Sequence, residues 1–464
     1  MYPNLENMAA PTSWPADTPI TTAPPLADAG EQWLKRGVWA YFFLLIFEGA
    51  LRKWVLPSLA TPLLIVRDPV ALWLLVATWR RGWLPANIYL TGFVTIGIVG
   101  IFTATLLGHG NLFVALFGAR ILLLHVPLIF VIGRIFNRTD VLQMGKVTLI
   151  IAVPMAVLIA LQFYSPQSAW VNRGIGGDVQ GGGFSGAMGF FRPPGTFSFT
   201  SGNTSFFSFV APFVFYFWLN RKTINNLLLF AATVALVFSV PLSISRSLFF
   251  QVGLSIVFLV LASVRKPENL LRLLLILAGA AVILVVLSQS NVFGTAASAF
   301  TDRFENANET EGGLQSVFID RFLGGLVGAL TGAGDLPFFG YGIGMGTNVG
   351  SMLLSGKISF LIAEGEWGRA IGELGPLLGI GLVLLRLGLA IKIALACYRK
   401  LSQGDLLPWM LLSFGLINLA QGGWAQPSAL GFFVLIGGLL VASLRTPPRR
   451  PSQLAPPSAE ALPS

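Results

Sequence analysis

Residues 428–444 read SALGFFVLIGGLLVASL, a run without a single charged side chain. A helix of that length extends about 25 Å at 1.5 Å per residue, close to the thickness of the hydrocarbon core of a bilayer. Similar apolar runs recur along the chain, and they lack the alternation that is typical of membrane β-barrel strands. The pattern therefore predicts an all-α polytopic membrane protein with about twelve transmembrane helices.

We place the predicted spans by the length and apolar character of each run. They are residues 38–56, 60–79, 87–107, 117–134, 146–164, 204–220, 225–242, 247–264, 270–288, 368–396, 406–421 and 428–444.

The composition supports this class and excludes others. Hydrophobic residues make up 54% of the 464 residues and charged residues 11%, whereas a soluble domain carries about a quarter charged residues. A net charge of +10 is explained by basic residues beside membrane helices, so we expect no nucleic-acid partner. Because Cys397 is the only cysteine, we expect no intrachain disulfide, no structural zinc or iron–sulfur site and no cofactor.

Three regions follow from the same pattern. Residues 1–36 and 445–464 are rich in Pro, Ala and Ser or Thr, a composition that predicts disordered tails. Residues 37–444 form the transmembrane domain, with two long connections at 165–203 and 289–367. The first tail has no apolar core and is not expected to be a cleavable signal peptide.

Basic residues set the expected orientation. Alternate connections carry the pairs Lys35 and Arg36, Arg80 and Arg81, Arg134 and Arg138, Arg221 and Lys222, Arg265 and Lys266, Arg399 and Lys400, and Arg449 and Arg450. The positive-inside rule then predicts cytoplasmic termini in a bacterial inner membrane and two long periplasmic connections. Basic residues on the outer side run against this bias and need another explanation; they are chiefly Arg52, Lys53, Arg173, Arg192, Arg246, Arg303, Arg321, Lys357 and Arg369.

Charged residues also fall inside predicted spans. Arg67 and Asp68 interrupt the second span, and Arg120 and His125 lie in the fourth. An unpaired charge there is unfavourable by several kcal/mol. Two interpretations stay open: satisfied pairs packed between helices, or a cationic pocket for a lipid-linked anion.

The first long connection ends in RPPGTFSFTSGNTSFF. Pro193 and Pro194 fix the backbone φ directly after Arg192 and stiffen the segment that presents it. Polar residues that follow are expected to cap the next helix; they are Thr200, Ser201, Asn203 and Thr204. Further along, Arg246 lies in SISRS, where it is either a snorkelling anchor or part of an anion site with neighbouring serines.

The second long connection contains three recognisable segments. Residues 314–330 are amphipathic and predict a surface helix that presents Asp320 and Arg321. In the stretch DLPFFGYGIGMGTN four glycines occupy every second position, which predicts a tight irregular loop. In AEGEWGRAIGELG, helical spacing predicts an ion-pair network of Glu366, Arg369 and Glu373, although carboxylates such as Glu364 and Glu366 could also serve as general bases.

Taken together, these motifs resemble the O-antigen ligase and O-antigen polymerase superfamily of bacterial membrane glycosyltransferases. Four segments carry the resemblance: RPPGTFSFTSGN, SISRS, FIDRFLGG leading to PFFGYGIGMGTN, and EWGRAIGELGPLLG. In ligase-like members a His-Asn pair precedes the glycine that matches Gly375, whereas Glu364 and Gly365 stand there in this chain. The choice between polymerase and ligase therefore stays open, as does the identity of the base.

The resemblance implies transfer of glycan from an undecaprenyl-diphosphate donor to a hydroxyl on a sugar or another acceptor at the periplasmic face. Because the sequence has no Asp-x-Asp pair and its outer connections hold no cluster of metal ligands, we expect this transfer to be metal-independent. The diphosphate would be bound by Arg192, Arg246, Arg321 and Arg369, since the guanidinium group binds phosphate oxygens bidentately. Glu364 or Glu366 would remove the proton from the acceptor. Expected partners are the lipid-linked glycan, its acceptor, membrane lipids and polysaccharide assembly proteins.

Two other functions remain open. Charged residues in spans are also typical of transporters, so the chain could export a lipid-linked glycan. A noncatalytic scaffold within a polysaccharide assembly complex is the third hypothesis.

Overall fold

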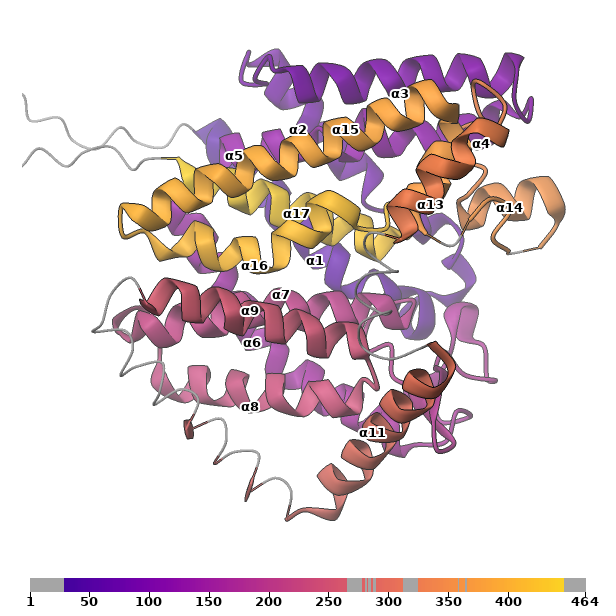
Figure 1. Ribbon diagram of the computed structural model, residues 1–464. Helices are drawn as coiled ribbons and strands as arrows, with labels where there is room; N and C mark the ends of the chain where they lie inside the picture. Colours follow the sequence, from indigo (N-terminus) through magenta and orange to yellow (C-terminus); the bar gives the residue numbers. More distant parts are fainter. Residues whose placement is uncertain are drawn as a thin grey trace, which may run out of the picture.

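The computed structural model describes residues 29–264, 278–279, 282, 285–286, 289–311, 324–357, 359–363 and 365–445. Within these residues the chain is almost entirely helical (Figure 1). Its sheet is one antiparallel hairpin of β1, Phe184–Ala187, and β2, Phe190–Arg192. The predicted all-α class is confirmed.

The α-helices are α1 Ala29–Ala50, α2 Asp68–Arg80, α3 Ile88–Leu106, α4 Leu112–Arg120, α5 Leu128–Ile135, α6 Arg138–Tyr164, α7 Thr200–Leu219, α8 Asn226–Leu242, α9 Arg246–Val264, α11 Asn291–Glu311, α13 Gly325–Thr331, α14 Asn348–Ser355, α15 Glu366–Ser402, α16 Leu406–Gln421 and α17 Pro427–Leu444. Short helices are η1 Leu51–Val55, η2 Pro57–Leu59, η3 Pro62–Ile65, η4 Ile121–His125, η5 Trp170–Asn172, η6 Ile175–Gly177, η7 Arg221–Thr223 and η9 Gly332–Asp335.

Seven helical segments in the described part of the chain are long and apolar enough to cross a membrane. They are Pro62–Arg80, Ile88–Leu106, Leu112–Ile135, Arg138–Tyr164, Arg246–Val264, Glu366–Ser402 and Pro427–Leu444. Helices α8 and α16 are apolar but shorter. The chain is therefore a multi-pass membrane protein, while most of the predicted span 270–288 lies outside the described residues.

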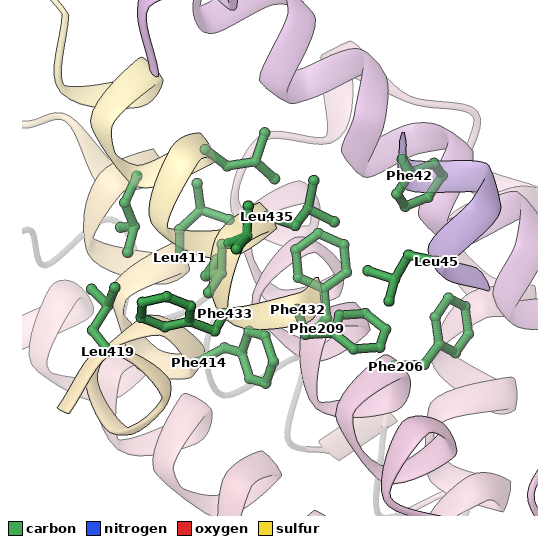
Figure 2. Close-up of a cluster of buried hydrophobic side chains, with 14 of the residues drawn as sticks. Phe42, Leu45, Phe206, Phe209, Leu411, Phe414, Leu419, Phe432, Phe433 and Leu435 are labelled. Atoms are coloured by element: carbon green, nitrogen blue, oxygen red, sulfur yellow. The ribbon is translucent and has the colours of Figure 1, made fainter. Parts of the chain in front are cut away.

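Helices α7 and α17 pack in the interior of the bundle and bury most of their side chains. Figure 2 shows phenylalanines of these two helices meeting Phe414 of α16, with Phe209 from α7 beside Phe432 from α17. Ring centroids of Phe209 and Phe432 lie 5.9 Å apart. Side-chain packing of this kind, together with close helix contacts, stabilises a bundle whose surroundings are as apolar as its interior.

Glycines allow the neighbours of α17 to approach closely. A β-carbon added to Gly431 would lie 2.2 Å from a guanidinium nitrogen of Arg67, and one on Gly438 would lie 2.6 Å from Cβ of Ile132. Small residues at helix contacts are typical of membrane bundles.

One end of the bundle collects the predicted basic connections. Lys35 forms an ion pair of 2.9 Å with Asp140, and Arg138 forms one of 2.6 Å with Asp405. Arg445 donates to the backbone carbonyl oxygen of Phe136 at 3.2 Å. The first turns of α1, the connection between α5 and α6, the connection between α15 and α16, and the residue after α17 thus meet at this end, which we call the basic end.

Two predicted boundaries need correction. Helix α1 begins at Ala29, so residues 29–36 belong to a helix and not to a disordered tail. The connection 289–367 is no plain loop, because α11, α13 and α14 lie within it. Only the last part of the predicted surface helix 314–330 is described, and it forms α13.

Helix α15 is broken at Gly375, which has φ 75° and ψ 177° and precedes Pro376. The glycine-rich loop packs into this break: a β-carbon on Gly375 would lie 2.3 Å from the carbonyl oxygen of Phe338. Gly340, Gly342 and Gly344 of that loop all have positive φ. The predicted tight irregular loop is confirmed.

Candidate functional site

The end of the bundle opposite the basic end is built around the segment that follows β2, residues 193–199. Side chains from two helical elements hold it in place. Lys53 of η1 donates to the carbonyl oxygen of Gly195 at 2.6 Å. Gln162 of α6 accepts from the Gly195 amide at 2.7 Å, and Arg52 donates to the Ser198 hydroxyl at 2.9 Å. The segment that the prolines stiffen is therefore also fixed by tertiary contacts.

Arg192 is the last residue of β2 and stands directly before this fixed segment. It pairs with Phe184 across the hairpin. Gly186 of β1 leaves room beside it, since a β-carbon there would lie 3.4 Å from Cγ of Arg192. The Nε atom of Arg192 is buried and has no hydrogen-bond partner in the described part of the chain.

Arg246 is the first residue of α9, where the chain turns out of α8. Ile244 has φ 46°, a left-handed conformation that is strained for a β-branched residue. Ser245 accepts a hydrogen bond of 3.1 Å from Thr204 of α7. This turn is thus held in an unfavourable conformation at the position that presents Arg246.

Helix α11 lies obliquely across the ends of α8 and α9, in contact with β1 (Figure 1). Aromatic rings attach it to α9: Phe249 lies 5.8 Å from Phe300 and 5.6 Å from Phe304, centroid to centroid. Arg303 stands between these two α11 phenylalanines in sequence. The aromatic contacts therefore fix the helix that carries Arg303.

Arg192, Arg246 and Arg303 interact electrostatically, and we call them the arginine cluster. The pKa of Arg192 is lowered to about 10, first by burial and then by the positive charges of Arg303 and Arg246. An anion bound at Arg192 would satisfy its unpartnered Nε atom and offset the repulsion from Arg303 and Arg246. The structure brings together Arg192 and Arg246, which were both predicted, and adds Arg303, which was noted only as an outer-side basic residue.

Glu366 and Arg369 lie in a different cluster at the start of α15. Arg369 donates to Glu366 at 2.7 and 3.0 Å and to Glu373 at 2.6 Å. Arg386 donates to Glu366 at 3.0 Å, and the backbone amide of Trp424 donates to it at 3.1 Å. The ion-pair network that helical spacing predicted is confirmed.

The two interpretations of Glu366 make different demands on its carboxylate. A general base needs an oxygen that the acceptor hydroxyl can reach, whereas both oxygens of Glu366 accept hydrogen bonds and the side chain is buried. Two carboxylates and two guanidinium groups also neutralise one another in this network. The geometry favours a structural role for Glu366 and Arg369 over direct contact with a substrate.

The charged residues within the spans form pairs, as the first of the two interpretations predicted. Asp68 contacts Arg120 and accepts a hydrogen bond of 3.0 Å from Nε2 of His125. Arg67 pairs with Glu48 at 3.2 Å, and Arg52 shares that carboxylate at 3.4 Å. Buried charges in a membrane interior are tolerated when they are paired in this way.

Two predicted residues, Arg321 and Glu364, lie outside the described residues. The predicted cap of α7 is wrong: Phe199 is the N-cap residue and no side chain caps the helix. Asn203 instead donates to the carbonyl oxygen of Pro193 at 3.2 Å. Among the described residues, no three His, Cys, Asp or Glu side chains gather as a metal site would require.

The chain was compared with models of known protein families and with curated proteins, and neither comparison finds a match.

Proposed function

We propose that the chain is a bacterial inner-membrane glycosyltransferase of the O-antigen polymerase or ligase kind, with about twelve spans and both termini in the cytoplasm. In this proposal the basic end faces the cytoplasm, following the positive-inside rule. The arginine cluster then lies at the periplasmic face, where it binds the diphosphate of an undecaprenyl-linked glycan.

One observation carries the proposal: the buried Nε atom of Arg192 has no hydrogen-bond partner in the described part of the chain, and burial together with the positive charges of Arg303 and Arg246 lowers the pKa of Arg192. A diphosphate supplies the negative charge that such a cluster favours. Arginine binds phosphate oxygens bidentately and stays charged at neutral pH. Fixed positive charge also stabilises the negative charge that grows on the leaving diphosphate.

The proposed reaction exchanges one glycosyl–oxygen bond for another. The acceptor hydroxyl oxygen bonds to the anomeric carbon of the donor glycan, the bond from that carbon to the phosphate oxygen breaks, and the acceptor O–H bond breaks as its proton passes to water. Undecaprenyl diphosphate leaves with the electron pair. Its charge remains paired with the arginine cluster until it departs.

Purified protein in liposomes with a lipid-diphosphate-linked glycan tests this proposal. We expect longer or transferred glycan from the wild-type protein and loss of product from Arg192→Ala, with Arg173→Ala of the same connection as the matched control. Movement of intact donor across the bilayer without glycan product would instead identify an exporter. Product that is unaffected by Arg192→Ala would contradict the assigned role of the cluster.

A further inference from the structure

Two connections at the end of the bundle that carries the arginine cluster are joined by a pair of tryptophans. Trp54 of η1 and Trp170 of η5 stack with ring centroids 5.5 Å apart and an interplanar angle of 26°. The indole N–H of Trp54 donates to the carbonyl oxygen of Trp170 at 3.1 Å. The pair therefore holds the connection after α1 against the connection after α6.

Exposed apolar side chains of η1, η2 and η6, three short helices that pack against one another, accompany this pair. Val55 is 63% exposed and Trp170 is 59% exposed. Further exposed apolar side chains are Leu56, Leu59 and Ile175. Gly177 lies against Pro57, since a β-carbon on it would be 3.4 Å from Cβ of Pro57. We call these exposed residues, together with Trp54, the tryptophan patch.

The charged side chains of η1 are buried beside the patch, with the ammonium group of Lys53 4.5 Å from the centre of the Trp54 ring. Arg52 and Lys53 directly precede Trp54, yet they are 8% and 1% exposed and bind groups inside the protein. Residues 54–66 contain no charged residue at all. A surface of this kind in contact with water would be unfavourable, because large apolar patches on soluble surfaces are uncommon.

The membrane-crossing helices of the same chain indicate what covers the patch. The crossing helix α6 ends at Tyr164, which is exposed, and Trp170 stands only six positions later. Leu59 lies three residues before the crossing segment Pro62–Arg80. The patch is thus continuous with lipid-facing helix ends, the level at which tryptophan and tyrosine are enriched because their rings are apolar and their N–H or O–H groups are polar.

We propose that the interfacial layer of the bilayer, at the junction of headgroups and acyl chains, covers the tryptophan patch and anchors this end of the protein. The anchor is coupled to the segment 193–199, since Arg52 and Lys53 adjoin the patch and bind Ser198 and Gly195. The bilayer thereby fixes the depth of the backbone that follows Arg192. This inference does not depend on the proposed reaction.

Tryptophan fluorescence of the protein in liposomes tests the anchor. The difference between the emission spectra of wild type and the Trp54→Phe/Trp170→Phe variant reports on the pair. We expect this component to be quenched by lipids brominated near the headgroup, more than by lipids brominated near the chain end, and little by iodide in the water. The control is the emission that Trp367→Phe removes. Trp367 is buried, so iodide should not quench this emission.

The opposite pattern, quenching by iodide and none by brominated lipids, would overturn the proposal and point to a surface facing water, a soluble glycan or a protein.

A second measurement covers the case that the double variant misfolds. Cys397 is buried, so a nitroxide label on Val55→Cys is selective. We expect collisions of this label with oxygen, which concentrates in the bilayer, to exceed its collisions with a water-soluble nickel complex. The reverse order at Val55→Cys would contradict the anchor. Glu305→Cys on exposed α11 is the control, and there we expect the reverse order.

Discussion

Lys53 donates a hydrogen bond of 2.6 Å to the carbonyl oxygen of Gly195, 142 positions later in the chain. This buried ammonium group has no carboxylate partner in the described part of the chain. Burial of a charge without a counterion is unfavourable, and hydrogen bonds offset part of that cost. The Lys53 hydrogen bond holds the backbone three residues after Arg192.

The Lys53→Met variant tests that relationship. We expect it to weaken binding of a lipid diphosphate by about tenfold to a hundredfold, because a small misplacement of a positioned group has an effect of that size. Lys146→Met, which removes a charge from the half-buried face of α6, should bind as wild type does. Equal affinities for the Lys53 variant and wild type, measured by equilibrium binding in detergent, would remove Lys53 from the account.

We predict that the positive charge of Arg303, after burial, helps to lower the pKa of Arg192. Because Arg192 must be charged to bind an anion, thermal stabilisation of the protein by pyrophosphate should fall as the pH rises through about 10, the lowered pKa of Arg192. Removing a nearby positive charge raises that pKa, so Arg303→Gln should shift the fall to higher pH. Arg192→Gln, which lacks the titrating group, is the control and should not show this fall. An unchanged pH midpoint in Arg303→Gln would contradict the assignment of Arg303 to the arginine cluster.

Glu366→Gln should mainly affect stability. The carboxylate neutralises Arg369 and Arg386 in a buried network, and removal of one member of a buried ion pair lowers the free energy of unfolding by about 3–5 kcal/mol. Glu305→Gln on the exposed face of α11 should change it little. A Glu366→Gln protein with unchanged thermal stability and no transfer activity would instead support the general-base interpretation.

Gly375→Ala should disrupt the break in α15. The added β-carbon would lie 2.3 Å from the carbonyl oxygen of Phe338, and φ of 75° with ψ of 177° is accessible essentially only to glycine. We expect a loss of about 3 kcal/mol or more in the free energy of unfolding. Gly253→Ala on α9, where nothing lies within 4 Å of the new carbon, should be neutral or stabilising by about 0.5–1 kcal/mol; equal effects of the two changes would argue against the described break.

The helices were predictable from sequence because an apolar run of membrane length has few alternatives. The span predicted at residues 406–421 coincides with α16, and the one at 225–242 differs from α8 by one residue. The network of Glu366, Arg369 and Glu373 was also predictable, since helical spacing places these residues within reach.

Contacts between distant segments could not be predicted in this way. Glu48 pairs with Arg67 of another helical segment, and no local pattern identifies that partner. Arg303 joins the arginine cluster because phenylalanines attach α11 to α9. The predicted caps of α7 failed for a related reason: Asn203 binds the backbone of Pro193, a contact that the local polar pattern does not reveal.

The most direct test of the central claim is the equilibrium binding of undecaprenyl diphosphate to purified wild type and to the Arg192→Ala/Arg246→Ala/Arg303→Ala variant, both shown to be folded by thermal unfolding. Charge-assisted hydrogen bonds contribute about 1.5–3 kcal/mol each, so we predict that affinity falls by a factor of about a hundred or more. Equal affinity of the two proteins would contradict the assignment of the arginine cluster as the diphosphate site.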